Sequence, residues 1–204
     1  MRRRRKEARP DEIIEAARAV FVERGFAAAR VDEIARKAGA SKGTVYLYFP
    51  TKEALFEAVM RVNVVSVIEA SAAAGQGDHD FPAPVELRMV METFYREFVA
   101  TDRKKLMHLM IAEGPHFPAL VDFYHREVVS RGMMLLTQLI EKGIRRGEFH
   151  PPPGLERYPK LILGPALLAA LYGSLFGERD QLDVADYAQV HIACVMRMLG
   201  VKEA

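Results

Sequence analysis

Along nearly the whole chain, apolar residues recur at spacings of three and four, which is the pattern of amphipathic α-helices. A sustained alternation of apolar and polar residues, which would indicate β-strands, does not occur in the sequence. Neither do the Asn-Gly and Asp-Gly pairs typical of tight hairpins. The sequence therefore predicts an all-α fold.

Turn-forming residues divide this helical pattern into segments. Gly25, Gly39 and Pro50 follow three short amphipathic stretches, and Thr51 offers a cap for a fourth, longer helix. The expected helices cover residues 10–25, 31–38, 42–49, 51–73, 83–100, 102–113, 117–146, 155–177 and 183–199. The predicted architecture is three short N-terminal helices, a long connecting helix and a larger C-terminal bundle, about nine helices in total.

Residues 161–177 carry no charge over 17 positions. A membrane span is one interpretation, but a spanning helix needs about 20 apolar residues, and Gly164-Pro165 and Gly173-Ser174 interrupt this one. Its small side chains would let another helix approach closely. We expect a helix of the core and of a subunit interface, with no membrane partner.

The charge is concentrated toward the N-terminus. Residues 1–60 hold 13 Lys and Arg against 9 Asp and Glu, whereas residues 61–204 hold 16 against 18. Residues 2–6 are five consecutive cations, a basic arm that would attract polyphosphate or serve only as a solvated tail. The single cysteine, Cys194, excludes an internal disulfide framework and fits a reducing, cytoplasmic location.

Residues 31–49 combine two short predicted helices with a turn at Gly39, the pattern of a helix-turn-helix. Ser41 can cap the second helix, and Val45 would anchor it inward. In such motifs the second helix enters the major groove of DNA. The alternative for Tyr46 or Tyr48 is packing against a neighbouring helix, with the hydroxyl group in water.

A long ordered motif covers this region and its flanks. It reads Ile14-x-x-Ala17-x-x-x-Phe21-x-x-x-Gly25-Phe26, then Val31-x-x-Ile34-Ala35-x-x-Ala38-Gly39, then Ser41-Lys42-Gly43-Thr44-Val45-Tyr46-x-Tyr48-Phe49-x-x-Lys52-Glu53-Ala54-Leu55. Through this motif, residues 10–60 resemble the DNA-binding domain of the tetracycline-repressor (TetR/AcrR) family of bacterial transcriptional regulators. The resemblance implies a helix-turn-helix domain over residues 1–50, with a basic arm over residues 1–9. Residues 51–204 would form the connecting helix and the ligand-binding and dimerisation domain.

The family resemblance also implies a homodimer that binds a palindromic double-stranded operator and responds to a small molecule. The DNA-binding residues carried over by position are Arg30, Ser41, Lys42, Gly43, Thr44, Tyr46, Leu47, Tyr48 and Lys52. Lys52 falls where the family's fourth helix meets a phosphate. Two positions depart from the family pattern: Ala29 cannot cap the second helix, and Leu47 offers only apolar contact to a base.

The C-terminal region is rich in aromatic and methionine side chains, which suit an adaptable apolar ligand pocket or an ordinary bundle core. The candidate pocket residues are Phe94, Phe98, Met107, Met110, Phe117, Phe123, Tyr124, Leu168 and Tyr172. The candidate dimer-interface residues are Ala166, Ala170, Gly173, Ile192, Val195, Met196 and Leu199. Because few fixed charges accompany the pocket residues, the expected effector is mainly apolar or aromatic.

Other chemistry finds little support in the sequence. His108, His116 and His125 do not match a recognised zinc-binding spacing, and neither a phosphate-binding glycine loop nor a serine nucleophile motif occurs. We therefore expect no metal, no cofactor and no enzymatic activity. The preferred function is a ligand-responsive transcriptional regulator, most often a repressor in such a family. The alternatives are a dimeric helical protein that binds a small molecule, or an enzyme, without specific DNA binding.

Overall fold

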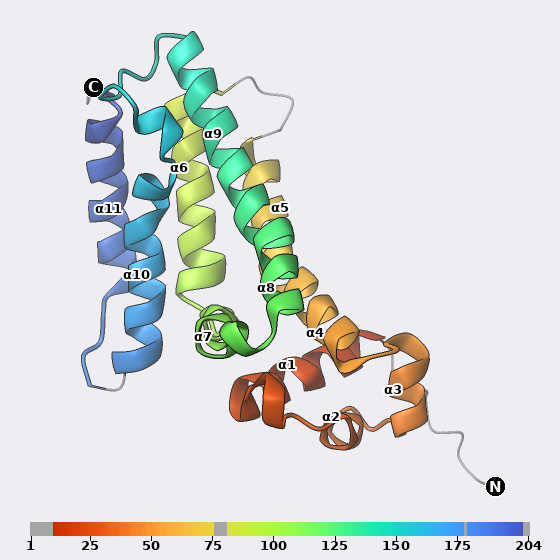
Figure 1. The fold of residues 1–204 in the computed structure, drawn as a ribbon. Helices are drawn as coiled ribbons and strands as arrows, with labels where there is room; N and C mark the ends of the chain where they lie inside the picture. The colour runs from red at the N-terminus through yellow and green to blue at the C-terminus, as the bar shows by residue number, and fades with distance from the viewer. Residues whose placement is uncertain (1–9, 76–80, 178, 202–204) are drawn as a thin grey trace, which may run out of the picture.

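A computed structural model describes residues 10–75, 81–177 and 179–201 (Figure 1). The predicted basic arm and the Gly/Asp-rich loop over residues 76–80 lie outside the described residues. Within the described part every regular element is helical, so the predicted all-α fold class is confirmed.

The N-terminal part begins with three short helices and a fourth that continues into the bundle. These are α1 (Pro10–Ala28), α2 (Val31–Lys37), α3 (Lys42–Tyr48) and α4 (Lys52–Met60), followed without a break by the π-helical turn η1 (Arg61–Val65) and α5 (Ser66–Gly75). Thr51 caps α4 as predicted, because its hydroxyl accepts a hydrogen bond from the backbone N–H of Ala54 at 3.0 Å. Together, α4, η1 and α5 form the long connecting helix.

The remaining helices form the C-terminal bundle. They are α6 (Ala83–Phe94) with η2 (Tyr95–Val99), α7 (Lys104–Glu113), η3 (Gly114–His116), α8 (Pro118–Tyr124), η4 (His125–Val129), α9 (Ser130–Arg145), η5 (Leu155–Arg157), α10 (Lys160–Phe176) and α11 (Val184–Met198). If π-helical turns are counted with the helices they join and the two 3-10 turns are left out, the described residues form nine continuous helices. This agrees with the predicted number.

An aromatic cluster holds the N-terminal part together. The ring centroids of Phe21 and Phe26 each lie 5.3 Å from that of Phe56 in edge-to-face geometry, which joins α1 to α4. Leu55 and Val59 of α4 are also fully buried in this core. The first half of the connecting helix therefore packs as part of the N-terminal unit.

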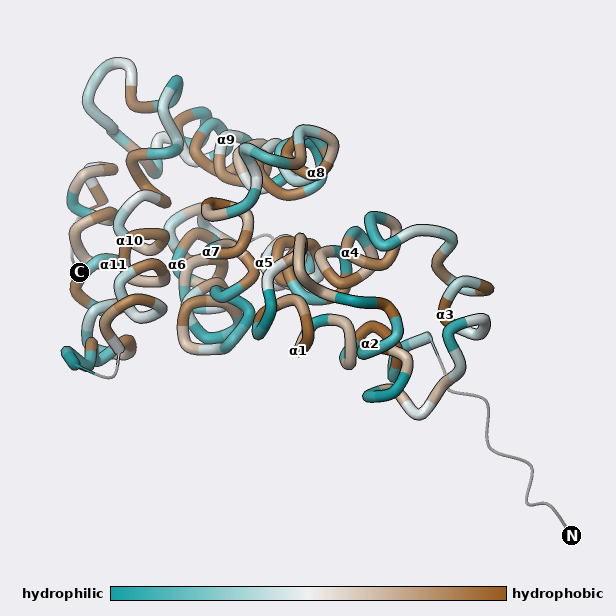
Figure 2. The backbone as a smooth tube through the Cα atoms, turned by 60° about the horizontal axis from the view of Figure 1, so that its bottom comes forward, coloured by the Kyte–Doolittle hydropathy of each residue, from teal (hydrophilic) through white to brown (hydrophobic). Residues whose placement is uncertain are grey.

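The helix-turn-helix lies at one end of the molecule, remote from the last two helices. In Figures 1 and 2, α3 projects on the side opposite α10 and α11. In Figure 1, α7 and α8 lie at the end of the bundle that is nearest to α1 and α4. Figure 2 also shows α8 and α9 on one side of the bundle and α6, α10 and α11 on the other. This arrangement leaves α3 open to a partner. The connecting helix lies between α3 and the interior of the bundle.

Glycine ends the first helix where predicted. Gly25 has φ +80° and ψ 167°, a conformation that L-residues with a side chain rarely adopt, so the regular helix stops there and residues 26–28 form a further turn. That turn lies against the C-terminal end of α7, where Glu113 contacts it. The N-terminal unit is thus attached to the bundle by the connecting helix and by this turn.

Candidate functional site

The helix α3 is capped and anchored as the sequence predicts. The Ser41 hydroxyl accepts a hydrogen bond from the backbone N–H of Thr44 at 3.0 Å, and the two side-chain oxygens lie 2.8 Å apart. Val45 is buried beneath the helix. With cap and anchor fixed, the rest of α3 faces outward.

The outward face of α3 is unusually apolar for a solvated surface. Leu47 is 79% exposed, and Tyr46 and Tyr48 are each about 40% exposed. The ring centroid of Tyr48 lies 6.4 Å from that of Phe49. Both tyrosine rings therefore keep accessible surface on this face of α3.

Two cations flank this face. The ammonium group of Lys42 lies 3.0 Å from Asp32, and the guanidinium of Arg30 lies 3.9 Å from the same carboxylate. All three side chains are well exposed, so these pairs are weak and the cations can exchange partners. Arg30, Ser41, Lys42, Gly43, Thr44, Tyr46, Leu47 and Tyr48 are thus brought together around α2 and α3, and all but half-buried Thr44 are exposed.

Lys52 is placed differently from the prediction. Its ammonium group donates to the backbone carbonyls of Phe26, Ala27 and Ala29, at 2.8, 3.1 and 3.3 Å, and lies 4.6 Å from the centroid of the Phe26 ring. An ammonium group has three N–H donors, and these bonds use all of them. In this conformation Lys52 therefore holds the end of α1, and its three donors are all engaged within the chain.

The bundle contains a cavity of about 330 Å³. It is lined by η1 and α5, by α6 and η2, by α8, η4 and α9, and by α10, with one residue from α11. Nearly all of its wall is aliphatic, aromatic or methionine. This is the size and composition of a site for a small apolar ligand.

Three of the nine predicted pocket residues line the cavity, namely Phe94, Phe98 and Tyr124. The other six do not. Met107, Met110 and Phe123 are buried in the core, Phe117 packs on Phe26 with centroids 4.8 Å apart, Leu168 is exposed, and Tyr172 donates a hydrogen bond to Asp180. The prediction failed for these because aromatic and methionine residues serve equally well in a packed core.

The predicted dimer-interface residues also require revision. Ala170, Ile192 and Leu199 have no exposed surface in the single chain, Ala166, Val195 and Met196 are buried, and Gly173 is half-buried. A side chain enclosed by its own chain cannot form an intermolecular surface in this conformation. The exposed apolar residues of α10 and α11 are instead Leu161, Leu168, Leu175, Phe176 and Val190.

Sequence reasoning missed three polar residues at the cavity: Ser71, Tyr95 and His191. Tyr95 and His191 hydrogen-bond to each other, with 2.8 Å between Oη and Nδ1. Burial lowers the pKa of His191, an effect that the carbonyl group of Ile162 opposes, and burial raises the pKa of Tyr95. Tyr95 lies among Thr93, Arg96 and Glu97, so no local pattern singled it out, whereas His191 is a polar residue between Val190 and Ile192.

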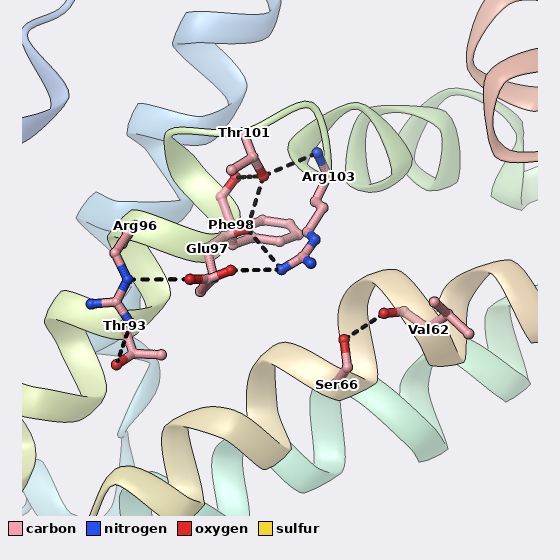
Figure 3. A network of polar contacts seen from close by, with 8 residues as sticks. All are labelled: Val62, Ser66, Thr93, Arg96, Glu97, Phe98, Thr101 and Arg103. Carbon is pink, nitrogen blue, oxygen red and sulfur yellow. Dashed lines mark hydrogen bonds and ion pairs between the residues drawn. The ribbon is translucent and has the colours of Figure 1, made fainter. Parts of the chain in front are cut away.

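Two arginines near the cavity, Arg96 and Arg103, each form an ion pair with Glu97. Figure 3 shows Glu97 between Arg96 and Arg103, at 3.2 and 3.1 Å, with Thr101 donating to the Glu97 carbonyl at 2.8 Å. Arg96 is well exposed, so its pair with Glu97 is weak, and neither Arg96 nor Arg103 is among the residues that line the cavity. Among the cavity-lining residues, Lys160 is the only one with a cationic side chain, and it is exposed.

Two absences among the described residues concern a membrane span and a metal site. No helix there is long and apolar enough to cross a membrane. Nor do three or more His, Cys, Asp or Glu side chains in those same residues gather in a way that could hold a metal ion.

Comparisons with known proteins agree with this geometry. Residues 13–59 match the model of the family described as bacterial regulatory proteins, tetR family. The HTH-type transcriptional regulator YvdT of Bacillus subtilis is 31% identical over 104 residues, a match that spans 51% of this chain and 51% of YvdT. The HTH-type transcriptional regulator YfiR of the same organism is 22% identical, over 90% of this chain and 88% of YfiR.

The similarity in fold extends through the bundle. The transcriptional regulator FadR from Bacillus subtilis, solved in complex with stearoyl-CoA, superposes with a TM-score of 0.74 at 18% identity. That superposition covers 93% of this chain and 99% of FadR. The capped and exposed α3, the matched N-terminal domain and the shared fold together support a bacterial transcriptional regulator of the TetR family.

Proposed function

We propose that the protein is a repressor that binds a palindromic operator as a homodimer and leaves it when an apolar or aromatic effector occupies the bundle cavity. The observation that carries the DNA-binding part is the exposed face of α3. A helix that presents Tyr46, Leu47 and Tyr48 to solvent, with cations at its rim, suits the edges of bases and the phosphates beside them.

The proposed contacts divide by chemistry. Lys42 and Arg30 are the candidates for phosphate, because both are exposed and only weakly paired. Thr44, Tyr46, Leu47 and Tyr48 are the candidates for base edges, with Leu47 suited to a thymine methyl group. Ser41 and Gly43 complete the set at the start of α3, while Lys52 is left out because its donors are used within the chain.

The proposed dimer uses the outer face of α10. Leu161, Leu168 and Leu175 recur every seven residues, so they lie along one side of this helix, and each is more than half exposed. Val190 of α11 is exposed to a similar extent. An apolar row of this kind favours burial against a second copy of the chain. Such a dimer would set two α3 helices about 34 Å apart, one turn of DNA.

The apolar wall of the cavity supports an effector that is mainly apolar or aromatic. A multiply charged molecule would need paired cations, and neither Arg96 nor Arg103 is among the residues that line the cavity. The solved complex of FadR with stearoyl-CoA supports the use of this fold for a ligand with a long apolar part. We assign residues 1–50 to DNA binding and residues 51–204 to connection, ligand binding and dimerisation.

The proposed DNA binding is tested by selecting fragments of genomic DNA with the purified protein and sequencing those that are retained. We expect enrichment of a short palindromic site. Tyr46→Ala should weaken binding to that site by about 1–3 kcal/mol, the value of a lost base contact. Tyr158→Ala, which alters an exposed tyrosine outside the helix-turn-helix, is the matched control and should bind as the wild type does. Selection of no common site would contradict the proposal.

A further inference from the structure

Two buried polar atoms at the cavity have no hydrogen-bond partner within the described residues. They are the Oγ of Ser71 and the Nε2 of His191, and both residues line the cavity. Ser71 is 3% exposed and His191 7% exposed, so neither atom is satisfied by bulk water. A buried polar group without a partner is costly, and most such groups in proteins are paired. The adjacent cavity supplies the space in which a ligand atom can be that partner.

What Nε2 of His191 can offer depends on the direction of its hydrogen bond to Tyr95, and we take the tyrosine hydroxyl as the donor to Nδ1. The neutral imidazole has one N–H group and one acceptor nitrogen. Burial lowers the pKa of His191, which keeps the ring uncharged at neutral pH. When the hydroxyl of Tyr95 donates to Nδ1, the ring proton lies on Nε2. His191 then presents one N–H donor in a largely apolar wall, in which the Oγ of Ser71 is the other unpartnered polar atom.

The distribution of charges around the cavity disfavours an ionic ligand group as the partner of the His191 N–H group. Lys160 is the only cationic lining residue, and it is exposed rather than enclosed. Arg96 and Arg103 are both paired with Glu97 (Figure 3). A carboxylate at His191 would therefore lose its hydration without gaining a buried counter-charge. An uncharged acceptor, such as a carbonyl oxygen, avoids this cost.

We propose that His191 is the specificity-determining residue of the cavity and binds an effector with one uncharged hydrogen-bond acceptor on an apolar or aromatic body. At about 30 Å³ for each water-sized group, the cavity holds about eleven non-hydrogen atoms. An aryl or alkyl ketone or ester of that size fits this description. The assignment rests on the proposed function, in which the same cavity receives the effector.

The assignment is tested with two uncharged probes that differ by one oxygen atom and with a third probe that carries a carboxylate. Butyrophenone carries a ketone oxygen that butylbenzene lacks, and 4-phenylbutanoate carries a carboxylate instead. We expect the wild type, in titration calorimetry, to bind butyrophenone about tenfold more tightly than butylbenzene, the effect of one hydrogen bond to a buried donor. 4-Phenylbutanoate should bind more weakly than butyrophenone.

The double variant Tyr95→Phe/His191→Phe removes both hydrogen-bonding partners, so no buried polar group is left behind from the pair. It should bind butyrophenone and butylbenzene with equal affinity. His108→Phe is the matched control, because His108 also has an unpartnered buried nitrogen but does not line the cavity. This variant should keep the full preference for the ketone.

The outcomes separate this assignment from the proposed function. Equal wild-type affinity for the two uncharged probes, or a preference that survives in the double variant, overturns the role of His191 and leaves the cavity as an effector site. A ketone preference that depends on His191, in a protein whose operator binding never responds to cavity ligands, supports the assignment and contradicts the proposed function. If neither uncharged probe binds the wild type, both are contradicted.

Discussion

The carboxylate of Glu113 holds the last turn of α1, residues 26–28. One of its oxygens accepts a hydrogen bond from the backbone N–H of Phe26 at 3.0 Å, and the other accepts one from Ala27 at 2.8 Å. Gly25 is required beside it, since a Cβ there would lie 1.9 Å from Oε1 of Glu113. Lys52 binds the carbonyl groups of the same turn. The end of α1 is thus fixed by α4 on one side and by the bundle on the other.

Glu113→Ala should therefore loosen the attachment of the N-terminal unit. Two backbone N–H groups lose a charged acceptor, which should lower the free energy of unfolding by about 1.5–3 kcal/mol. Urea denaturation measures this change. The control is Glu141→Ala, which removes only an exposed carboxylate 3.6 Å from Arg145 and should cost less than about 0.5 kcal/mol. If the two variants were equally stable, the Glu113 hydrogen bonds would contribute nothing to the free energy of unfolding.

Replacing Lys52 separates a structural role from a phosphate contact. Lys52→Met leaves three backbone carbonyls without their donor, so we expect a loss of stability of about 1–3 kcal/mol. The salt dependence of operator binding should stay unchanged. Lys42→Ala should do the opposite, keeping stability and lowering the slope of log affinity against log salt by about one unit. A reduced slope for Lys52→Met would restore the phosphate contact.

Two separate substitutions to glutamate on α10, two residues apart, test the proposed dimer surface. Leu168→Glu places a charge on the exposed row of α10 and should yield a folded monomer in sedimentation equilibrium. Ala170→Glu buries a carboxylate in the core of the single chain, so it should lower the melting temperature instead. Met134→Glu, at an exposed position on α9, should remain dimeric. A Leu168→Glu variant that stays dimeric contradicts the proposed interface.

The pH dependence of stability should report the buried ring of His191. Its pKa in the folded protein is lowered by burial, whereas in the unfolded chain it is about 6.5. As the pH falls through that value, the unfolded state takes up a proton that the folded state does not. The free energy of unfolding should therefore fall below about pH 6.5 and be unaffected by this residue above it.

The Tyr95→Phe/His191→Phe variant lacks this titrating group and provides the comparison. Urea denaturation between pH 5 and pH 8 should show the wild type losing stability relative to the variant only in the acidic part of the range. Curves that remain parallel over the whole range would mean that His191 is not buried as an uncharged ring.

The helices were predictable because their determinants are local. Gly25 ends the regular part of α1, and Ser41 and Thr51 cap α3 and α4. Val45 anchors α3 in the core. Each of these features follows from a few neighbouring residues. The exposed aromatic face of α3 followed from the same pattern. These features depend on spacing and capping, which the sequence states directly.

The bundle was less predictable because α10 is apolar on every side. Leu168 and Ala170 are both uncharged and only two residues apart, yet one faces outward and the other inward. Periodicity cannot choose between the faces of such a helix, so positions that are buried in the single chain were predicted as interface positions. The contacts of Lys52 were not predictable for a related reason, since the carbonyls it binds lie 23 to 26 residues away in sequence.

The most direct test of the account measures whether the cavity and α3 are coupled. The affinity of the wild-type protein for its selected operator would be measured by fluorescence anisotropy, with and without saturating amounts of the tightest cavity ligand. We expect the ligand to weaken operator binding about tenfold or more, and the operator to weaken ligand binding by the same factor. In Ala166→Phe, where a larger side chain fills part of the cavity, operator binding should persist without the response. Unchanged operator affinity with the cavity occupied would contradict the account.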